Sequence, residues 1–144
     1  MTGSVATHHG QGTNPSWAGR LPAGARRGGC ALGAALYSRG GESLYSDAMT
    51  VLPGKTRGNH YHVAKNEILL IMPGCAWTLY WDDGEGTAPR HETFTGETAV
   101  AVCIGPGASH AIANTGQGAL TVLGLSDKPY DPANPDAHMR NVMP

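Results

Sequence analysis

Two histidines and one glutamate lie close together between Gly54 and Gly74, in the stretch GKTRGNHYHVAKNEILLIMPG. One residue separates His60 from His62, and Glu67 follows five positions after the second histidine. Imidazole nitrogens and carboxylate oxygens are common ligands of divalent transition metals. The spacing therefore predicts a metal site, and a divalent ion bound there would act as a Lewis acid.

These three side chains converge only if the surrounding chain is extended and then turns back. Alternate side chains of a strand share one face, so His60 and His62 point the same way while Tyr61 points oppositely. The turn VAKN leads into the next apolar run, and an antiparallel connection brings Glu67 back toward the histidines. His110 is a fourth candidate ligand, because the Gly-Pro-Gly turn before it allows a close backbone approach.

Short apolar runs separated by turn signals continue along the chain from Cys30 onward, and they predict an all-β fold. The 144 residues include 21 glycines and 10 prolines, which indicates many tight turns. Strand-length runs, none with a sustained helical period, are CALGAALYS, LYSDAMTVL, EILLIM, AWTLYW, TAVAVCI, HAIAN and ALTVLGLS. We expect a flexible N-terminal arm over residues 1–28 and one sandwich or barrel domain over residues 29–144.

The spacing of the candidate ligands resembles the cupin family. The first cupin motif, G-x5-H-x-H-x4-E-x6-G, is matched without a gap from Gly54 to Gly74. The second, G-x5-P-x-G-x2-H-x3-N, is matched only by its last glycine, histidine and asparagine, because Ala99 and Gly105 replace its first glycine and its proline. The departures affect turn residues and keep the histidine ligand, His110.

This resemblance covers about residues 44–127 and implies a cupin double-stranded β-helix, which is a small jelly-roll barrel, with a metal ion inside its mouth. Cupins that keep the pattern without binding metal also exist, so a hydrogen-bonded histidine cluster is the alternative interpretation. Three imidazoles and one carboxylate suit Zn, Fe, Ni or Mn alike. The implied ligand set is His60, His62, Glu67 and His110.

Two shorter stretches narrow the resemblance within the family. TRGNHYH, at residues 56–62, and YDPANPD, at residues 130–136, are similar to segments of the cupin domains of capsular-polysaccharide sugar-nucleotide reductases and, more loosely, of keto-sugar isomerases. This implies epimerisation or isomerisation of a nucleotide-linked keto sugar in polysaccharide or secondary-metabolite biosynthesis. The alternatives are an Fe-dependent cupin oxygenase and a noncatalytic small-molecule-binding cupin.

Proton transfer beside a carbonyl needs a general base, for which the sequence offers three candidates. Tyr80 lies opposite the apolar face of its strand and is expected to line the cavity, His91 lies in a predicted loop, and Tyr45 is the third candidate. Arg57 and Lys55 precede the first histidine and are candidates for binding a phosphate-bearing substrate. The alternative for both cations is a solvated turn.

Composition excludes several classes of partner. Charged residues make up 15% of the chain and the net charge is -1, so neither nucleic-acid binding nor membrane-surface binding is expected. No apolar run approaches the roughly 20 residues of a membrane span, and the start lacks a secretion signal, which predicts a soluble cytoplasmic protein. We expect Cys30, Cys75 and Cys103 to pack as small apolar residues. Edge strands that need covering predict a homodimer. The expected partner at the site is a small-molecule substrate.

Overall fold

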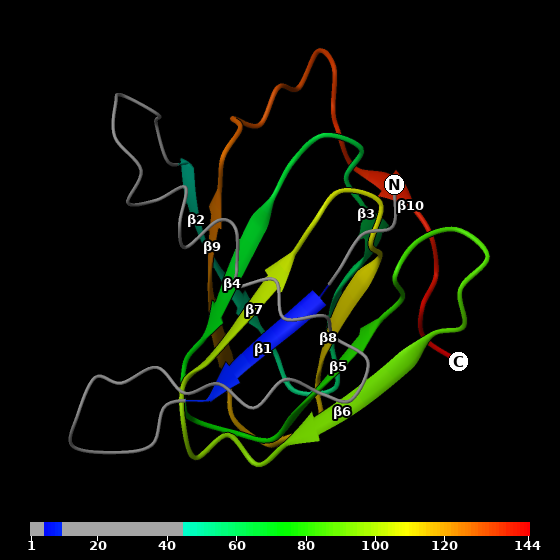
Figure 1. Cartoon of the computed structure of the whole chain (residues 1–144). Coiled ribbons are helices and arrows are strands. Elements are labelled where there is room, and N and C mark those ends of the chain that lie inside the picture. Colours follow the sequence, from blue (N-terminus) through cyan, green and yellow to red (C-terminus); the bar gives the residue numbers. More distant parts are fainter. Residues whose placement is uncertain (1–4, 10–44) are drawn as a thin grey trace.

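The computed structural model describes residues 45–144 in full and the backbone of residues 5–9. Within these residues the chain forms two five-stranded antiparallel sheets that face each other (Figure 1). The strands are β1 (Val5–His9), β2 (Tyr45–Val51), β3 (Thr56–Tyr61), β4 (Glu67–Ile71), β5 (Trp77–Trp81), β6 (Arg90–Phe94), β7 (Val100–Ile104), β8 (His110–Asn114), β9 (Leu120–Ser126) and β10 (His138–Met139).

Strands that are distant in sequence lie side by side in both sheets. One sheet has the order β1-β7-β4-β9-β2, and the other has the order β10-β3-β8-β5-β6. The β3–β8 pair joins the first motif region to the second, and the β4–β9 pair joins the first motif region to a strand more than 50 residues later in the chain. This arrangement confirms the predicted all-β cupin jelly roll.

The core lies between the sheets and follows the predicted alternation of side chains. Trp77 and Leu79 are completely buried and Trp81 is 4% exposed, so their face of β5 is core, as the sequence favoured. The Trp77 ring stacks on Phe94 at a centroid distance of 4.1 Å. Each such side chain contributes roughly 1.5–3 kcal/mol by leaving water, so this layer fixes the separation of the sheets that hold the site.

Two sequence predictions outside the site are wrong. Residues 90–94 form β6 and not a loop, because their backbone pairs with β5 and the Arg90 guanidinium packs 5.2 Å from the centre of the Trp81 ring. Cys75 is free and buried as expected, whereas Cys103 is disulfide-bonded. The predicted boundary at residue 28 lies outside the described residues, so the division into arm and domain stays a prediction. The backbone of β1 pairs with β7 at the edge of its sheet.

A bulge interrupts β3 immediately before the first histidine ligand. The register shifts between Gly58 and His60, and Asn59 between them has a φ of 58°. As a result Arg57 is opposite Ile112, and His60 is opposite His110. Both of these β8 residues line the cavity between the sheets, so the extra residue brings Arg57 onto the face that carries the histidines. Strict alternation of side chains, counted back from His60, would put Gly58 and not Arg57 on that face.

Candidate metal centre

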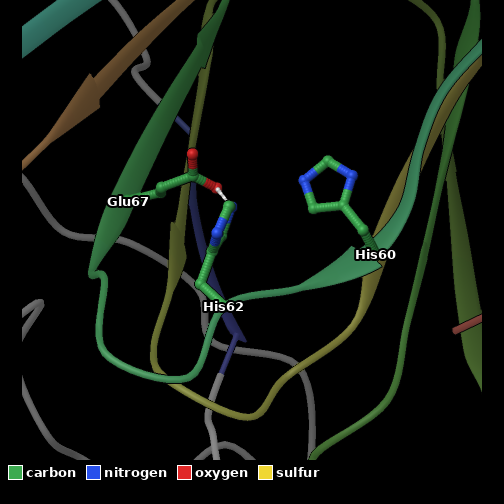
Figure 2. A group of neighbouring side chains, drawn as sticks. All are labelled: His60, His62 and Glu67. Atoms are coloured by element: carbon green, nitrogen blue, oxygen red, sulfur yellow. Dashed lines mark ion pairs between the residues drawn. The ribbon is translucent and has the colours of Figure 1, made fainter. Parts of the chain in front are cut away.

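Three predicted ligands meet at the open edge between the two sheets (Figure 2). His60 belongs to β3, His62 follows the end of that strand, and Glu67 is the first residue of β4. One ligand atom from each lies within 4.8 Å of the others. The Nε2 atom of His62 is 3.2 Å from a Glu67 carboxylate oxygen. β3 and β4 belong to different sheets, so the predicted antiparallel pairing of these two segments is wrong. The turn at residues 63–66 instead crosses from one sheet to the other and brings Glu67 to the histidines.

His110 extends this cluster from the neighbouring strand β8. Its Nε2 atom is 3.7 Å from the Glu67 carboxylate, and its ring centre is 4.7 Å from that of His60. It is not one of the three residues whose ligand atoms all lie within 4.8 Å of one another. The structure nevertheless brings all four predicted ligands to one place.

The chemistry of the cluster fits a bound divalent cation. His62 Nε2 and Glu67 Oε2 are buried and form an ion pair at 3.2 Å, but within the described residues neither atom makes a hydrogen bond of acceptable geometry, and neither does His110 Nδ1. Buried polar atoms are normally satisfied, so paired orphans that face one space indicate a missing ligand. Imidazole nitrogens with one carboxylate form a donor set typical of borderline divalent ions.

Burial and the charge of Glu67 set the protonation of the cluster. Complete burial lowers the pKa of His110 to about 3, so this imidazole is neutral at pH 7. Burial acts to raise the pKa of Glu67, but its pairing with His62 and the nearby His110 outweigh it and lower that pKa. Burial and the neighbouring His62 lower the pKa of His60. The cluster thus offers an ionised carboxylate beside neutral imidazoles, which is the form that binds metal.

The pKa of His62 is raised, whereas the pKa values of His60 and His110 are lowered. Burial acts to lower its pKa, but its interaction with Glu67 and the hydrogen bond to the main-chain oxygen of Asp136 outweigh burial and raise that pKa. A metal ion must therefore displace a proton from His62 more often than from His60.

The metal-free protein is expected to lose stability as the pH falls below 6.5, because of His110. Its pKa is about 3 in the folded state and 6.5 ordinarily, so the unfolded chain takes up this proton first. The stability due to a neutral His110 is complete above pH 6.5 and is lost at up to about 1.4 kcal/mol per pH unit below it. Chemical unfolding at stepped pH values measures this slope.

A His110→Asn variant is the control for this prediction, since asparagine cannot take up the proton. Its stability should fall less steeply between pH 6.5 and 5 than that of the wild type. The raised pKa of His62 contributes stability that is present below pH 6.5 and lost as the pH rises, and it acts in both proteins. Equal slopes in the two proteins would contradict the assignment to His110.

Two adjoining cavities open at this edge of the sandwich. The first has a volume of about 650 Å³ and contains the four candidate ligands, and the second has a volume of about 660 Å³. Glu67 and Asp47 line both cavities, so the metal cluster stands at their junction.

The other predicted site residues divide between this edge and other surfaces. Arg57 lines the first cavity, and Tyr45, which is 40% exposed, lines the second. Lys55 is exposed in the turn before β3 and lines neither cavity. Tyr80 and His91 have ring centres 5.8 Å apart and line a separate cavity of about 490 Å³. Of the three candidate bases, only Tyr45 lines a cavity that a candidate ligand, Glu67, also lines.

Sequence reasoning missed the role of Asp136 at this site. Its main-chain oxygen lies 2.5 Å from His62 Nδ1, although 74 positions separate the two residues. The stretch YDPANPD that ends at Asp136 was noted for its resemblance to related sequences, but no local spacing connects it with the histidines. Only the pairing of β10 with β3 brings it there.

Comparison with known proteins supports the predicted fold and shows which protein family the chain matches. Residues 37–138 match the family model described as the polysaccharide biosynthesis C-terminal domain. The UDP-2-acetamido-2,6-beta-L-arabino-hexul-4-ose reductase of Pseudomonas aeruginosa is 35% identical over 94 residues, which are 65% of this chain and 25% of that protein. The chain therefore spans about a quarter of the length of this curated relative.

Two solved structures are similar to this chain in fold. The capsular polysaccharide assembling protein CapF from Staphylococcus aureus has a TM-score of 0.62 and 26% identity, over 67% of this chain and 28% of CapF. ChmJ, a 3'-monoepimerase from Streptomyces bikiniensis solved with dTDP-quinovose, has a TM-score of 0.56 and 20% identity, over 67% of this chain and 51% of ChmJ. The second likeness shows a shared fold alone. Within the described residues, no helix is long and apolar enough to cross a membrane.

Proposed function

The chain belongs to the family of the polysaccharide biosynthesis C-terminal domain, within the cupin superfamily, and we propose that it is a metal-dependent epimerase or isomerase of a nucleotide-linked keto sugar. The observation that carries this proposal is the union, in one cavity, of the His60–His62–Glu67–His110 cluster with the Arg57 guanidinium. A cavity with a metal-binding wall and an arginine suits a substrate that has both a carbonyl group and a phosphate.

The relatives support this substrate class. The P. aeruginosa relative is named for a UDP-linked hexulose, and the S. bikiniensis structure contains a dTDP-linked sugar. We do not extend to this chain the reduction named for the P. aeruginosa relative, because the matched region is only a quarter of that protein. The element that these two proteins share is the sugar nucleotide.

The proposed chemistry removes and returns a proton on the carbon beside the carbonyl. The electron pair of the broken C–H bond moves toward the carbonyl oxygen to give an enolate, and return of a proton to the opposite face of the carbon inverts its configuration. A divalent ion held by His60, His62, Glu67 and His110 supplies electrophilic polarisation of the carbonyl when bound. Zn, Fe, Ni and Mn all suit this donor set.

The chain's own residues supply binding and proton transfer. Arg57 is exposed at the cavity wall, and no hydrogen bond or ion pair of its guanidinium is found in the described part of the chain, so its donors are available for a diphosphate. Tyr45 lies in the same cross-strand row as Glu67, because Ser126 of β9 pairs with both. We propose Tyr45 as the residue that removes the proton on one face of the carbon, with water returning a proton on the other face, and a homodimer as the working assembly.

Deuterium incorporation tests the proposed function. In heavy water, zinc-loaded or iron-loaded protein is expected to exchange the hydrogen beside the carbonyl of a UDP-linked or dTDP-linked 4-keto-6-deoxy sugar. NMR measures the loss of the proton signal over time. Chelator-treated protein should show exchange at the uncatalysed rate, which makes it the matched control.

Two results would overturn the proposed function. The first is an absence of exchange across a panel of nucleotide-linked keto sugars with each of the four metals. The second is turnover of another metabolite that consumes O₂ and requires Fe(II), which would select the oxygenase. A folded protein that binds sugar nucleotides without exchange would select the noncatalytic binding function.

A further inference from the structure

The segment that follows β9 returns to the metal centre and is built to hold a fixed shape. Asp131 caps the turn within YDPANPD, because its carboxylate accepts a hydrogen bond from the Ala133 N–H at 2.9 Å and its carbonyl accepts one from the Asn134 N–H at 3.2 Å. Pro132 and Pro135 restrict the backbone on either side of this turn. The turn places Asp136 beside the loop that connects β3 of one sheet with β4 of the other.

Asp136 contacts that loop with its carboxylate and a ligand side chain with its backbone. The carboxylate accepts hydrogen bonds from three successive N–H groups, those of residues 63, 64 and 65, at 2.9, 3.0 and 3.1 Å. Its main-chain oxygen lies 2.5 Å from Nδ1 of His62. The carboxylate thus fixes the main-chain oxygen of the same residue against the His62 ring.

The contact with the main-chain oxygen determines which nitrogen of His62 carries a proton. A carbonyl oxygen can only accept a hydrogen bond, so Nδ1 must donate. In the neutral ring Nε2 then has the free lone pair, and Nε2 is the atom that lies 3.2 Å from Glu67. The free lone pair therefore points into the candidate metal centre, as a ligand requires.

The residues after Asp136 attach to the strand that carries the histidines. β10 pairs with β3, which places His138 opposite Tyr61 and Met139 opposite His60. The Arg140 N–H donates to the bulge residue Asn59, and the Arg140 guanidinium lies 4.0 Å from the centre of the Tyr61 ring. The C-terminal segment therefore contacts the chain on both sides of His60 and His62, at Asn59 before them and at residues 63–65 after them.

We propose that Asp136 is a positioning residue of the metal centre, which holds His62 in its Nδ1–H tautomer with Nε2 directed at the ion. The functional consequence rests on the proposed metal-dependent activity, whereas the tautomer does not. Without the carboxylate the 63–65 loop loses three acceptor contacts at once, and the main-chain oxygen is no longer fixed. Loss of such a supporting contact typically weakens metal binding about 10-fold to 100-fold.

The test compares Asp136→Ala with Asp131→Ala. Both substitutions remove one carboxylate from the same segment, but Asp131 caps only its own turn and does not contact His62. Nitrogen-15 NMR of the metal-free proteins in alkaline buffer, where the ring is neutral, reports which nitrogen of His62 is protonated. Competitive zinc titration then measures affinity.

We expect wild type and Asp131→Ala to show the Nδ1–H tautomer alone, and Asp136→Ala to show a mixture of tautomers with zinc binding weakened about 10-fold to 100-fold. Asp136→Asn retains one acceptor oxygen and should fall between, and it serves if the alanine variant does not fold. An unchanged tautomer and unchanged zinc affinity in a folded Asp136 variant would overturn the proposal. The tautomer result stands even if the protein proves to have no epimerase activity, so the two proposals can fail separately.

Discussion

Replacing His62 by alanine is expected to lower zinc affinity by more than about 100-fold and to reduce exchange of substrate hydrogen to the uncatalysed rate. His62 is buried, lies nearest to Glu67 of the candidate ligands, and has the ring nitrogen that the Asp136 backbone orients. Its loss removes one of four ligands and leaves the Glu67 carboxylate buried without its partner. Elemental analysis of protein purified without added metal, followed by competitive zinc titration, measures the effect.

His91→Ala is the matched control for this experiment. His91 is exposed on β6, contacts Tyr80, and lies in the part of the fold that does not line the metal cavity. Its metal content should equal that of the wild type. Full occupancy in folded His62→Ala protein, or an equal loss in His91→Ala, would show that the metal is held elsewhere or nonspecifically.

The ligand set was predictable because its geometry is almost entirely local. Alternation within β3 fixes the common direction of His60 and His62, and a four-residue turn returns the chain to Glu67. The placement of Tyr61 on the opposite face, against Arg140 and His138, agrees with the same alternation. The fold followed from the regular spacing of short apolar runs, which β2, β4, β5, β7, β8 and β9 reproduce.

The bulge at Asn59 was not predictable from alternation. It inserts one residue into β3 and changes which side chain shares a face with His60. Gly58 is required beside it for a reason that only the structure shows. Its φ is 108°, and an added Cβ would lie 2.4 Å from the main-chain oxygen of His110. The sequence shows a glycine there, but it does not show which neighbouring strand approaches.

The position of the candidate bases depended on contacts between distant strands. Tyr80 was expected in the cavity because it lies opposite the apolar face of its strand. It is the apolar face, however, that points into the space between the sheets. Tyr80 consequently lies with His91 on the other side of the sheet. Tyr45 reaches the site through β9, which lies between β2 and β4 in the sheet order. No spacing within the sequence specifies that order.

The proposed role of Arg57 depends on the same bulge, and it distinguishes Arg57 from a nearby cation. Arg57 lines the cavity that contains the four ligands, whereas Lys55, two residues earlier, is exposed in the preceding turn. If both belonged to a solvated turn, removing either would have the same small effect. If Arg57 binds the diphosphate, only its removal should weaken substrate binding.

Arg57→Ala is expected to weaken binding of a nucleotide-linked sugar about 10-fold to 100-fold, as loss of charge-assisted hydrogen bonds to a phosphate implies. Metal content should be unchanged, because Arg57 is not one of the candidate ligands. Lys55→Ala should change affinity by less than about 2-fold, the range of an exposed charge. Calorimetric titration of zinc-loaded protein with UDP and dTDP sugars measures both variants.

Arg57→Lys keeps the charge but loses the bidentate fork, so it should recover part of the affinity. Equal effects at Arg57 and Lys55, or no effect at Arg57, would contradict this role and favour the solvated turn for both cations.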